Sequence, residues 1–248
     1  MTTSAPSTTG YELYRKYVQA ITKRCGEDPG VRVALRRGLR RGLDDVQPMH
    51  RIVAPWLPDR RGEAEERAYY AVAAMIADSP RHTFNSRADN EESPAPDNHN
   101  ATPAPGNAPV APELVESDSA HNQPRSALPS RVSLGASFAH ATTFRGGQAG
   151  GLRENTAETR LNLLTRQGLD GLHRHLPAAV RLLRDNDADV DFASLLADLM
   201  AWPRYSKTIS RRWLQDYYRI RHAASEAAAR RRDEKNSDEN HGGTDGSD

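Results

Sequence analysis

The sequence has a single cysteine, Cys25, so it cannot form an internal disulfide. No second cysteine or histidine lies near it at zinc-site spacing, and we expect a buried structural thiol. The longest apolar runs, such as "AVAAMIA" at residues 71–77, are far shorter than the roughly 20 residues that span a bilayer. The first residues also lack the basic stretch and apolar core of a secretory leader. We therefore expect a cytoplasmic protein with no membrane partner.

Two segments that have few large apolar residues carry a net negative charge. Residues 80–129 carry a net charge of −4 and residues 233–248 a net charge of −5, although the whole chain has +1. Such segments cannot bury enough surface to offset their ordering entropy, so we expect a disordered linker and a disordered acidic tail. The remainder has a net charge of +10, as a polyanion-binding surface requires.

Strand-like alternation is scarce, and apolar residues instead recur at steps of three and four. The sequence predicts an all-α fold with two helical bundles: residues 10–79 with a basic helix, and residues 130–232 with four or five helices. Pro177 should start or kink one helix, Asp191 should cap the next, and the last should begin near Tyr205. Glycines at 145–151 should interrupt the second bundle, and one helix should run over 154–172.

Several segments resemble enzyme or metal-binding motifs but lack residues that those motifs require. "DNDADVD" at 185–191 resembles a calcium loop, but Val190 replaces the required glycine and Leu196 the glutamate. "RGGQAGG" lacks the lysine and hydroxyl residue of a phosphate loop. His173 and His175 are two apart, a spacing that separates them on a helix, so we expect surface or capping roles. The sequence predicts no catalytic residues, no metal and no cofactor.

The decapeptide "ALRRGLRRGL" at 34–43 concentrates four arginines and no acid. On a helical wheel its leucines lie within about 80°, and the arginines cover the adjoining arc from about 100° to 240°. Arginines at i,i+4 repel each other, and glycines lower helix propensity, so the helix is locally unfavourable. A polyanion along that face would relieve the repulsion. The alternative is a solvated face whose arginines pair with acids, Asp44 and Asp45 being nearest. We expect nucleic-acid contacts from Arg36, Arg37, Arg40 and Arg41.

A second basic set lies on the last predicted helix. We expect nucleic-acid contacts from Lys207, Arg211, Arg212 and Arg219. The neighbouring Trp213 and Tyr217 are more typical of a core than of a platform for stacked bases.

The order of motifs resembles one known family. The chain carries "YELYRKYV", "ALRRGLRRG", "YYAVAAMIA", "SLGASFA", "ETRLNLL", "VRLLRDNDADVDFASLLADLMAW" and "SRRWLQDYY". This series is similar to the small subunit of the type I-E CRISPR Cascade complex, the CasB family, over nearly all of both predicted bundles.

The resemblance implies a non-enzymatic subunit of an RNA-guided antiviral complex that helps to hold the R-loop open. The implied partners are the guide RNA, the target DNA with its displaced strand, the large subunit, the repeated backbone subunits and a second copy of the chain. In the family, basic residues of the kind that contacts the nucleic-acid backbone occupy the positions that match Arg36, Arg37, Arg211 and Arg212.

The chain departs from the family pattern at three places. Thr159 and Leu161 replace the usual arginine and phenylalanine, Pro177 follows Leu176 where arginine is common, and the linker is unusually long. Two other classes remain open at this stage. A free-standing helical DNA-binding regulator would need a recognition helix with base-reading side chains. A nuclease would need clustered acids for metal.

Overall fold

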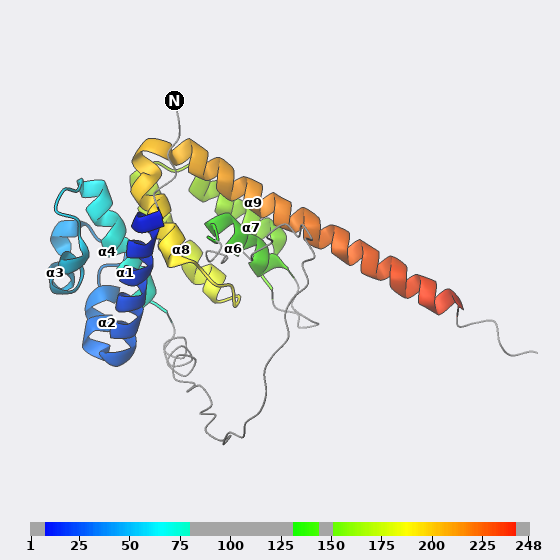
Figure 1. Cartoon of the computed structure of the whole chain (residues 1–248), viewed down its shortest axis with the longest axis horizontal. Coiled ribbons are helices and arrows are strands. Elements are labelled where there is room, and N and C mark those ends of the chain that lie inside the picture. The colour runs from blue at the N-terminus through cyan, green and yellow to red at the C-terminus, as the bar shows by residue number, and fades with distance from the viewer. Residues whose placement is uncertain (1–7, 80–130, 144–150, 242–248) are drawn as a thin grey trace, which may run out of the picture.

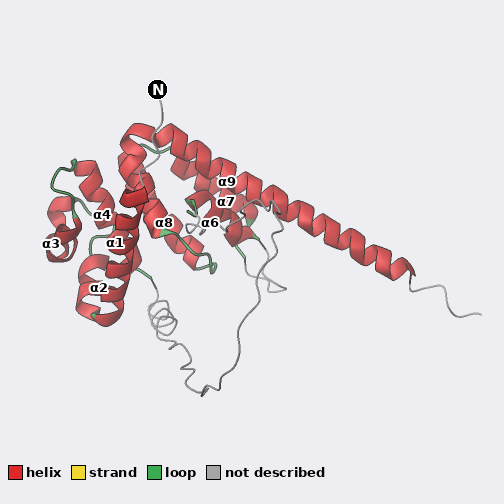
Figure 2. Cartoon of the chain, viewed as in Figure 1, coloured by secondary structure: helices red, strands yellow, loops and turns green. Residues whose placement is uncertain are grey.

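The computed structural model describes residues 8–79, 131–143 and 151–241, and every regular element in these ranges is helical (Figures 1 and 2). The all-α prediction is therefore confirmed. The predicted linker, residues 80–129, lies outside the described ranges, as does most of the glycine-rich break. The α-helices are α1 (Thr8–Glu27), α2 (Pro29–Arg36), α3 (Gln47–Val53), α4 (Glu63–Ala77), α6 (Leu134–Thr142), α7 (Glu154–Thr165), α8 (Leu169–Arg184) and α9 (Phe192–His241); two 3-10 turns, Leu43–Asp45 and Ala54–Trp56, flank α3.

The buried side chains of the two predicted bundles form one contiguous hydrophobic cluster. Helix α9 connects them, because it packs on α1 and α4 of the first half and on α6 and α7 of the second. The hydroxyl of Tyr11 in α1 donates a 2.9 Å hydrogen bond to Asp191, which precedes α9. The guanidinium of Arg131 lies 4.0 Å from the centre of the Tyr11 ring. The two halves therefore share a core, which bundles joined only by a linker would not.

Helix α1 places apolar side chains and the predicted buried thiol in the core. Tyr17 and Ile21 of α1 are buried, and Cys25 is a buried free thiol whose pKa burial raises to about 11. The Tyr17 hydroxyl donates to the carbonyl oxygen of Tyr69 in α4, 2.8 Å away, which satisfies a polar group inside the core. This contact joins α1 to α4, and the predicted burial of the Cys25 thiol is confirmed.

The predicted basic helix ends much earlier than its leucine spacing indicates. Helix α2 stops at Arg36, and the next residues turn through i,i+3 bonds from Gly38 to Leu35 and from Leu39 to Arg36. A Cβ at Gly38 would lie 2.1 Å from the sulfur of Met49, so α3 packs where a side chain would stand. Arg40 then adopts a left-handed backbone with φ 62°, which costs about 1 kcal/mol for a non-glycine residue. The prediction of one continuous arginine face over residues 34–43 is therefore wrong.

The helices before α9 also differ from the predicted boundaries. The helix expected over 154–172 divides into α7 and α8, which begins at Leu169. Pro177 lies inside α8 instead of starting it, although proline offers no N–H to the carbonyl oxygen of His173 four residues earlier. The prediction of a surface or capping role for His173 is wrong as well, because its side chain is buried on the side of α8 that faces the core.

Helix α9 contains a sharp turn at Tyr205, whose φ of −128° and ψ of 23° are non-helical. The predicted helix start near Tyr205 corresponds to this turn, and Asp191 caps the first arm by accepting from the Ser194 N–H at 2.9 Å. The second arm extends well past α6 and α7 (Figure 1) and is helical through His241. The acidic residues 233–241, expected to be disordered, therefore continue this helix.

Candidate functional site

The first predicted basic set is divided by the end of α2. Arg36 lies in the last turn of the helix, and its side chain forms an ion pair of 3.3 Å with Asp78 at the end of α4. Asp78 also accepts hydrogen bonds from Arg181 of α8, at 2.5 and 3.0 Å. The acid that pairs with this motif is therefore Asp78, and not Asp44 or Asp45 as the sequence suggested. Arg36 therefore helps to join α2, α4 and α8.

The other three arginines of the motif remain exposed. Arg37 caps the C-terminus of α2, and Arg40 and Arg41 follow in the turn. None of the three has an ion pair or side-chain hydrogen bond with another described residue. Because opposing acids are absent there within the described ranges, these three guanidinium groups are available to an external anion.

Arg40 and Arg41 also line a cavity of about 480 Å³ that the sequence did not predict. The turn after α2 forms one wall, and helices α4 and α8 form the others. Arg67 of α4 and Arg174 of α8 add two further guanidinium groups, and Asp170 adds one carboxylate that is paired with Arg67. Tyr70 and several leucine, alanine, valine and proline residues also line the cavity. The cavity is therefore both cationic and partly apolar.

His173 lines the same cavity and is 6% exposed. Its Nε2 atom is buried without a hydrogen-bond partner among the described residues. Burial, with a smaller contribution from nearby Arg67, lowers the pKa of His173 to about 4. The imidazole is therefore neutral near pH 7.

The second predicted basic set lies on the long arm of α9, and its members have different surroundings. Lys207 and Arg211 are exposed and have no acid partner among the described residues. Arg212 pairs with the buried carboxylate of Asp198, and Arg219 pairs with Asp216 one turn away on the same helix. Trp213 and Tyr217 are buried, which confirms the prediction that they belong to the core.

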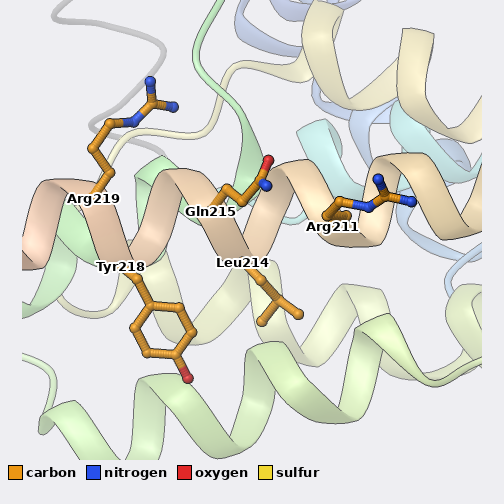
Figure 3. A pocket seen from close by; sticks show the side chains of 5 residues that line it. All are labelled: Arg211, Leu214, Gln215, Tyr218 and Arg219. Carbon is orange, nitrogen blue, oxygen red and sulfur yellow. The ribbon is translucent and has the colours of Figure 1, made fainter.

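Figure 3 shows a shallow hollow along this arm, formed by Arg211, Leu214, Gln215, Tyr218 and Arg219. Leu214 and Tyr218 point toward α7, and the arginines point away from it. The Tyr218 hydroxyl donates a 2.5 Å hydrogen bond to Glu158 of α7, yet 47% of the residue remains exposed. An exposed aromatic edge beside cations is a feature of surfaces that bind single strands.

The structure therefore gives two separate basic surfaces. We define the turn surface as Arg37, Arg40 and Arg41, and the α9 surface as Lys207, Arg211 and Arg219. The turn surface follows α2, which packs on α1, α3 and α4, whereas the other surface lies on α9, which packs on α1, α4, α6 and α7. Arg67 and Arg174 carry no local sequence signal for this site, because only the packing of α4 against α8 brings them to Arg40. Across the described ranges, no group of three or more metal-ligating side chains is placed to hold a metal ion.

No helix in the described ranges is long and apolar enough to cross a membrane. The search of curated proteins returned no significant match. A solved chain described as "CRISPR RNA-guided surveillance complex, pre-nicking" is 30% identical and superposes with a TM-score of 0.66, covering 88% of this chain and 98% of that one. A chain described as "CRISPR RNA-guided surveillance complex" is 29% identical, with a TM-score of 0.63 and coverage of 88% and 99%.

A third solved chain, CasB from Thermus thermophilus, shows the same fold at 20% identity. Its TM-score is 0.50, and the match covers 83% of this chain and 97% of that one. The model of the family described as CRISPR-associated protein Cse2 matches residues 31–218, a range that includes most of α2, the turn surface, and Lys207 and Arg211 of the α9 surface. From this match and the predicted series of motifs, the chain belongs to the Cse2 family and is a subunit of a CRISPR surveillance complex of the Cascade type.

Proposed function

We propose that this chain is a non-catalytic, cytoplasmic subunit that binds nucleic-acid backbone without sequence specificity and stabilises the R-loop. The observation that carries the proposal is a set of five cations without acid partners among the described residues: Arg37, Arg40, Arg41, Lys207 and Arg211. Uncompensated arginine and lysine on two faces of a subunit would repel each other unless an external polyanion balanced their charge.

The buried and partly buried carboxylates support a structural role in place of acid–base chemistry. Asp198 is bound by Arg212 and Trp213, and Asp191 caps α9. Asp78 is bound by two arginines. A general acid or base must be free to exchange its proton with a substrate, and these carboxylates are instead held by the fold.

Phosphate contacts of this kind suffice for the proposed role because guide pairing already supplies sequence discrimination. Exchanging a DNA duplex for a guide–target hybrid is nearly balanced in free energy, so a few kcal/mol decide whether the R-loop persists. Each cation that neutralises a phosphate displaces a counterion and contributes to this stabilisation. We infer that the displaced DNA strand contacts one basic surface and that the guide RNA or target strand contacts the other.

We further propose protein partners on the remaining exposed faces: the large subunit, the repeated backbone subunits and a second copy of this chain. Tyr205, at the α9 turn, is 51% exposed, and Leu13 of α1 is 57% exposed. Exposed apolar side chains of this size are enriched where subunits meet. Native mass spectrometry of the reconstituted complex measures the copy number, for which we expect two.

The test of the proposal is a triple charge reversal of the turn surface, Arg37→Glu, Arg40→Glu and Arg41→Glu, in the assembled complex. Arg36 stays unchanged because its ion pair with Asp78 is structural. We expect normal assembly, a shorter R-loop lifetime and a salt dependence of affinity whose logarithmic slope is smaller by about 2, as three lost single-strand phosphate contacts require.

The matched control reverses three exposed arginines that lie outside both surfaces, Arg24, Arg60 and Arg166. This control changes the net charge by the same amount but should leave the R-loop lifetime close to the parent value. If the control shortens the lifetime as much as the turn variant does, binding depends on overall charge and the assignment of the turn surface is wrong.

A further inference from the structure

We propose that the cavity between the turn after α2, helix α4 and helix α8 binds one nucleotide, with its phosphate on the arginines and its base on the apolar wall. This inference rests on the proposed function but goes beyond it, because general backbone binding needs a surface and no cavity. The site is assembled from both halves of the chain, and two of its four arginines, Arg67 and Arg174, lie outside the predicted motif.

The charge of the cavity favours a single anion. Among the described residues that line it, Asp170 is the one carboxylate, and Arg67 already balances it. Arg40, Arg41 and Arg174 have no partner among the described residues. Three planar guanidinium groups from two segments can donate several charge-assisted hydrogen bonds to one phosphate, which a lysine cluster would bind with less directionality.

The remaining groups argue for more than a phosphate ion. The cavity volume of about 480 Å³ lies within the range of small-molecule sites and far exceeds the space that a phosphate occupies. Leu39, Leu43 and Pro177 give it an apolar wall. A nucleotide combines an anionic group with a flat, largely apolar base, so it matches both parts of the lining.

His173 supplies an independent indication that a polar ligand belongs here. The residue is more than nine-tenths buried, lines the cavity, and its Nε2 atom has no partner among the described residues. Leaving a buried polar atom unpaired is unfavourable, and native proteins rarely do so without a reason. Nε2 is shielded from solvent in this structure, so a ligand in the cavity would reach it after a small rotation of the ring, and the neutral imidazole would then donate to a phosphate or base oxygen.

Two glycines of the turn contribute to the lining of the cavity. Gly38 and Gly42 both line the cavity and present only backbone on that side. Gly38 cannot be replaced without displacing Met49, whose sulfur would lie 2.1 Å from a new Cβ. A strand that follows the turn surface could therefore bring its backbone close to the cavity and place one nucleotide in it.

The experiment titrates the full chain with thymidine 5′-monophosphate and, separately, with inorganic phosphate at matched ionic strength. Calorimetry measures affinity, and NMR follows the ring protons of His173. We expect the nucleotide to bind more tightly than phosphate and to shift the His173 resonances. The double variant Arg41→Ala and Arg174→Ala should weaken nucleotide binding by about tenfold to a hundredfold.

The control variant Arg60→Ala and Arg166→Ala removes two exposed arginines remote from the cavity lining and should bind the nucleotide normally. Equal affinity for phosphate and nucleotide would overturn the proposal, because the apolar wall would then contribute nothing. Failure of the nucleotide to shift the His173 resonances would overturn it too. A 20-nucleotide oligothymidine, titrated into the assembled complex of the parent chain, separates the two hypotheses. Strand binding by a parent complex whose chain does not bind the mononucleotide overturns the cavity proposal alone. Failure to bind either ligand overturns the proposed function as well.

Discussion

The indole N–H of Trp213 donates a 2.6 Å hydrogen bond to a carboxylate oxygen of Asp198, fifteen residues earlier on the same helix. In a straight helix these residues would be about 22 Å apart, so the bond exists only because α9 turns back at Tyr205. Trp202 packs on Trp213 across the same turn, with ring centres 5.2 Å apart. The second carboxylate oxygen of Asp198 accepts from Arg212. One buried carboxylate therefore fixes both the turn and the direction of the α9 surface.

Replacing Asp198 should destabilise the protein strongly. Asp198→Ala leaves the buried N–H of Trp213 without an acceptor and removes the partner of Arg212, so we expect a loss of about 2–4 kcal/mol. Asp198→Asn keeps an acceptor for the indole and should lose less. Urea unfolding followed by tryptophan fluorescence measures both variants, and equal losses would show that the hydrogen bond to Trp213 contributes little.

Neighbouring arginines on α9 should give opposite results. Arg211→Glu should weaken strand binding and leave stability unchanged, because Arg211 is exposed and has no acid partner among the described residues. Arg212→Glu brings a second carboxylate against Asp198 and should lower the unfolding midpoint. Thermal unfolding and oligonucleotide titration of both variants separate the two effects. If Arg211→Glu lowered stability and left binding intact, the α9 surface would be assigned wrongly.

The contact between α6 and α9 depends on one glycine. A Cβ on Gly135 would lie 1.8 Å from the carbonyl oxygen of Trp213, and a backbone atom cannot move aside as a side-chain end can. Gly135→Ala should therefore force the helices apart and cost about 2–4 kcal/mol. Gly168→Ala provides the comparison, because a Cβ there meets nothing within 4 Å. Similar midpoints of urea unfolding for the two variants would contradict this close approach.

Acid should destabilise the protein through His173. Its pKa is about 4 in the folded chain, against an ordinary value of about 6.5, because burial penalises the charged imidazole. The neutral side chain contributes full stability above pH 6.5, and this contribution of about 3 kcal/mol is lost as the pH falls from 6.5 to 4.

His173→Phe should flatten the pH dependence of the unfolding free energy within that window. An NMR titration of the parent chain checks the same point without a substitution, since the His173 ring should titrate near pH 4. A midpoint near 6.5 would show that the ring is solvated.

Local patterns predicted the helices well where each one depends on its own sequence. The recurrence of apolar residues at steps of three and four predicted helices, and Asp191 caps α9 as expected, because amphipathic spacing and capping act within a few residues. The arginine motif shows where such reasoning fails. Its leucine spacing fits a helix, but Met49 from α3 occupies the space beside Gly38 and the chain turns away at Arg36. That contact is not visible in the local pattern.

The sequence by itself determined the all-α class, the family motifs and the concentration of positive charge in residues 34–43 and on the last helix. Tertiary structure alone decided which of these arginine and lysine side chains pair with an acid in the described ranges and which do not. Asp78 and Asp198 are distant in sequence from Arg36 and Arg212, respectively, and only helix packing and the α9 turn bring each pair together. The same packing joins Arg40 and Arg41 to Arg67, Arg174 and His173 around a cavity. Electrostatic pairing depends on distance in space, which a helical wheel shows only for residues of one helix.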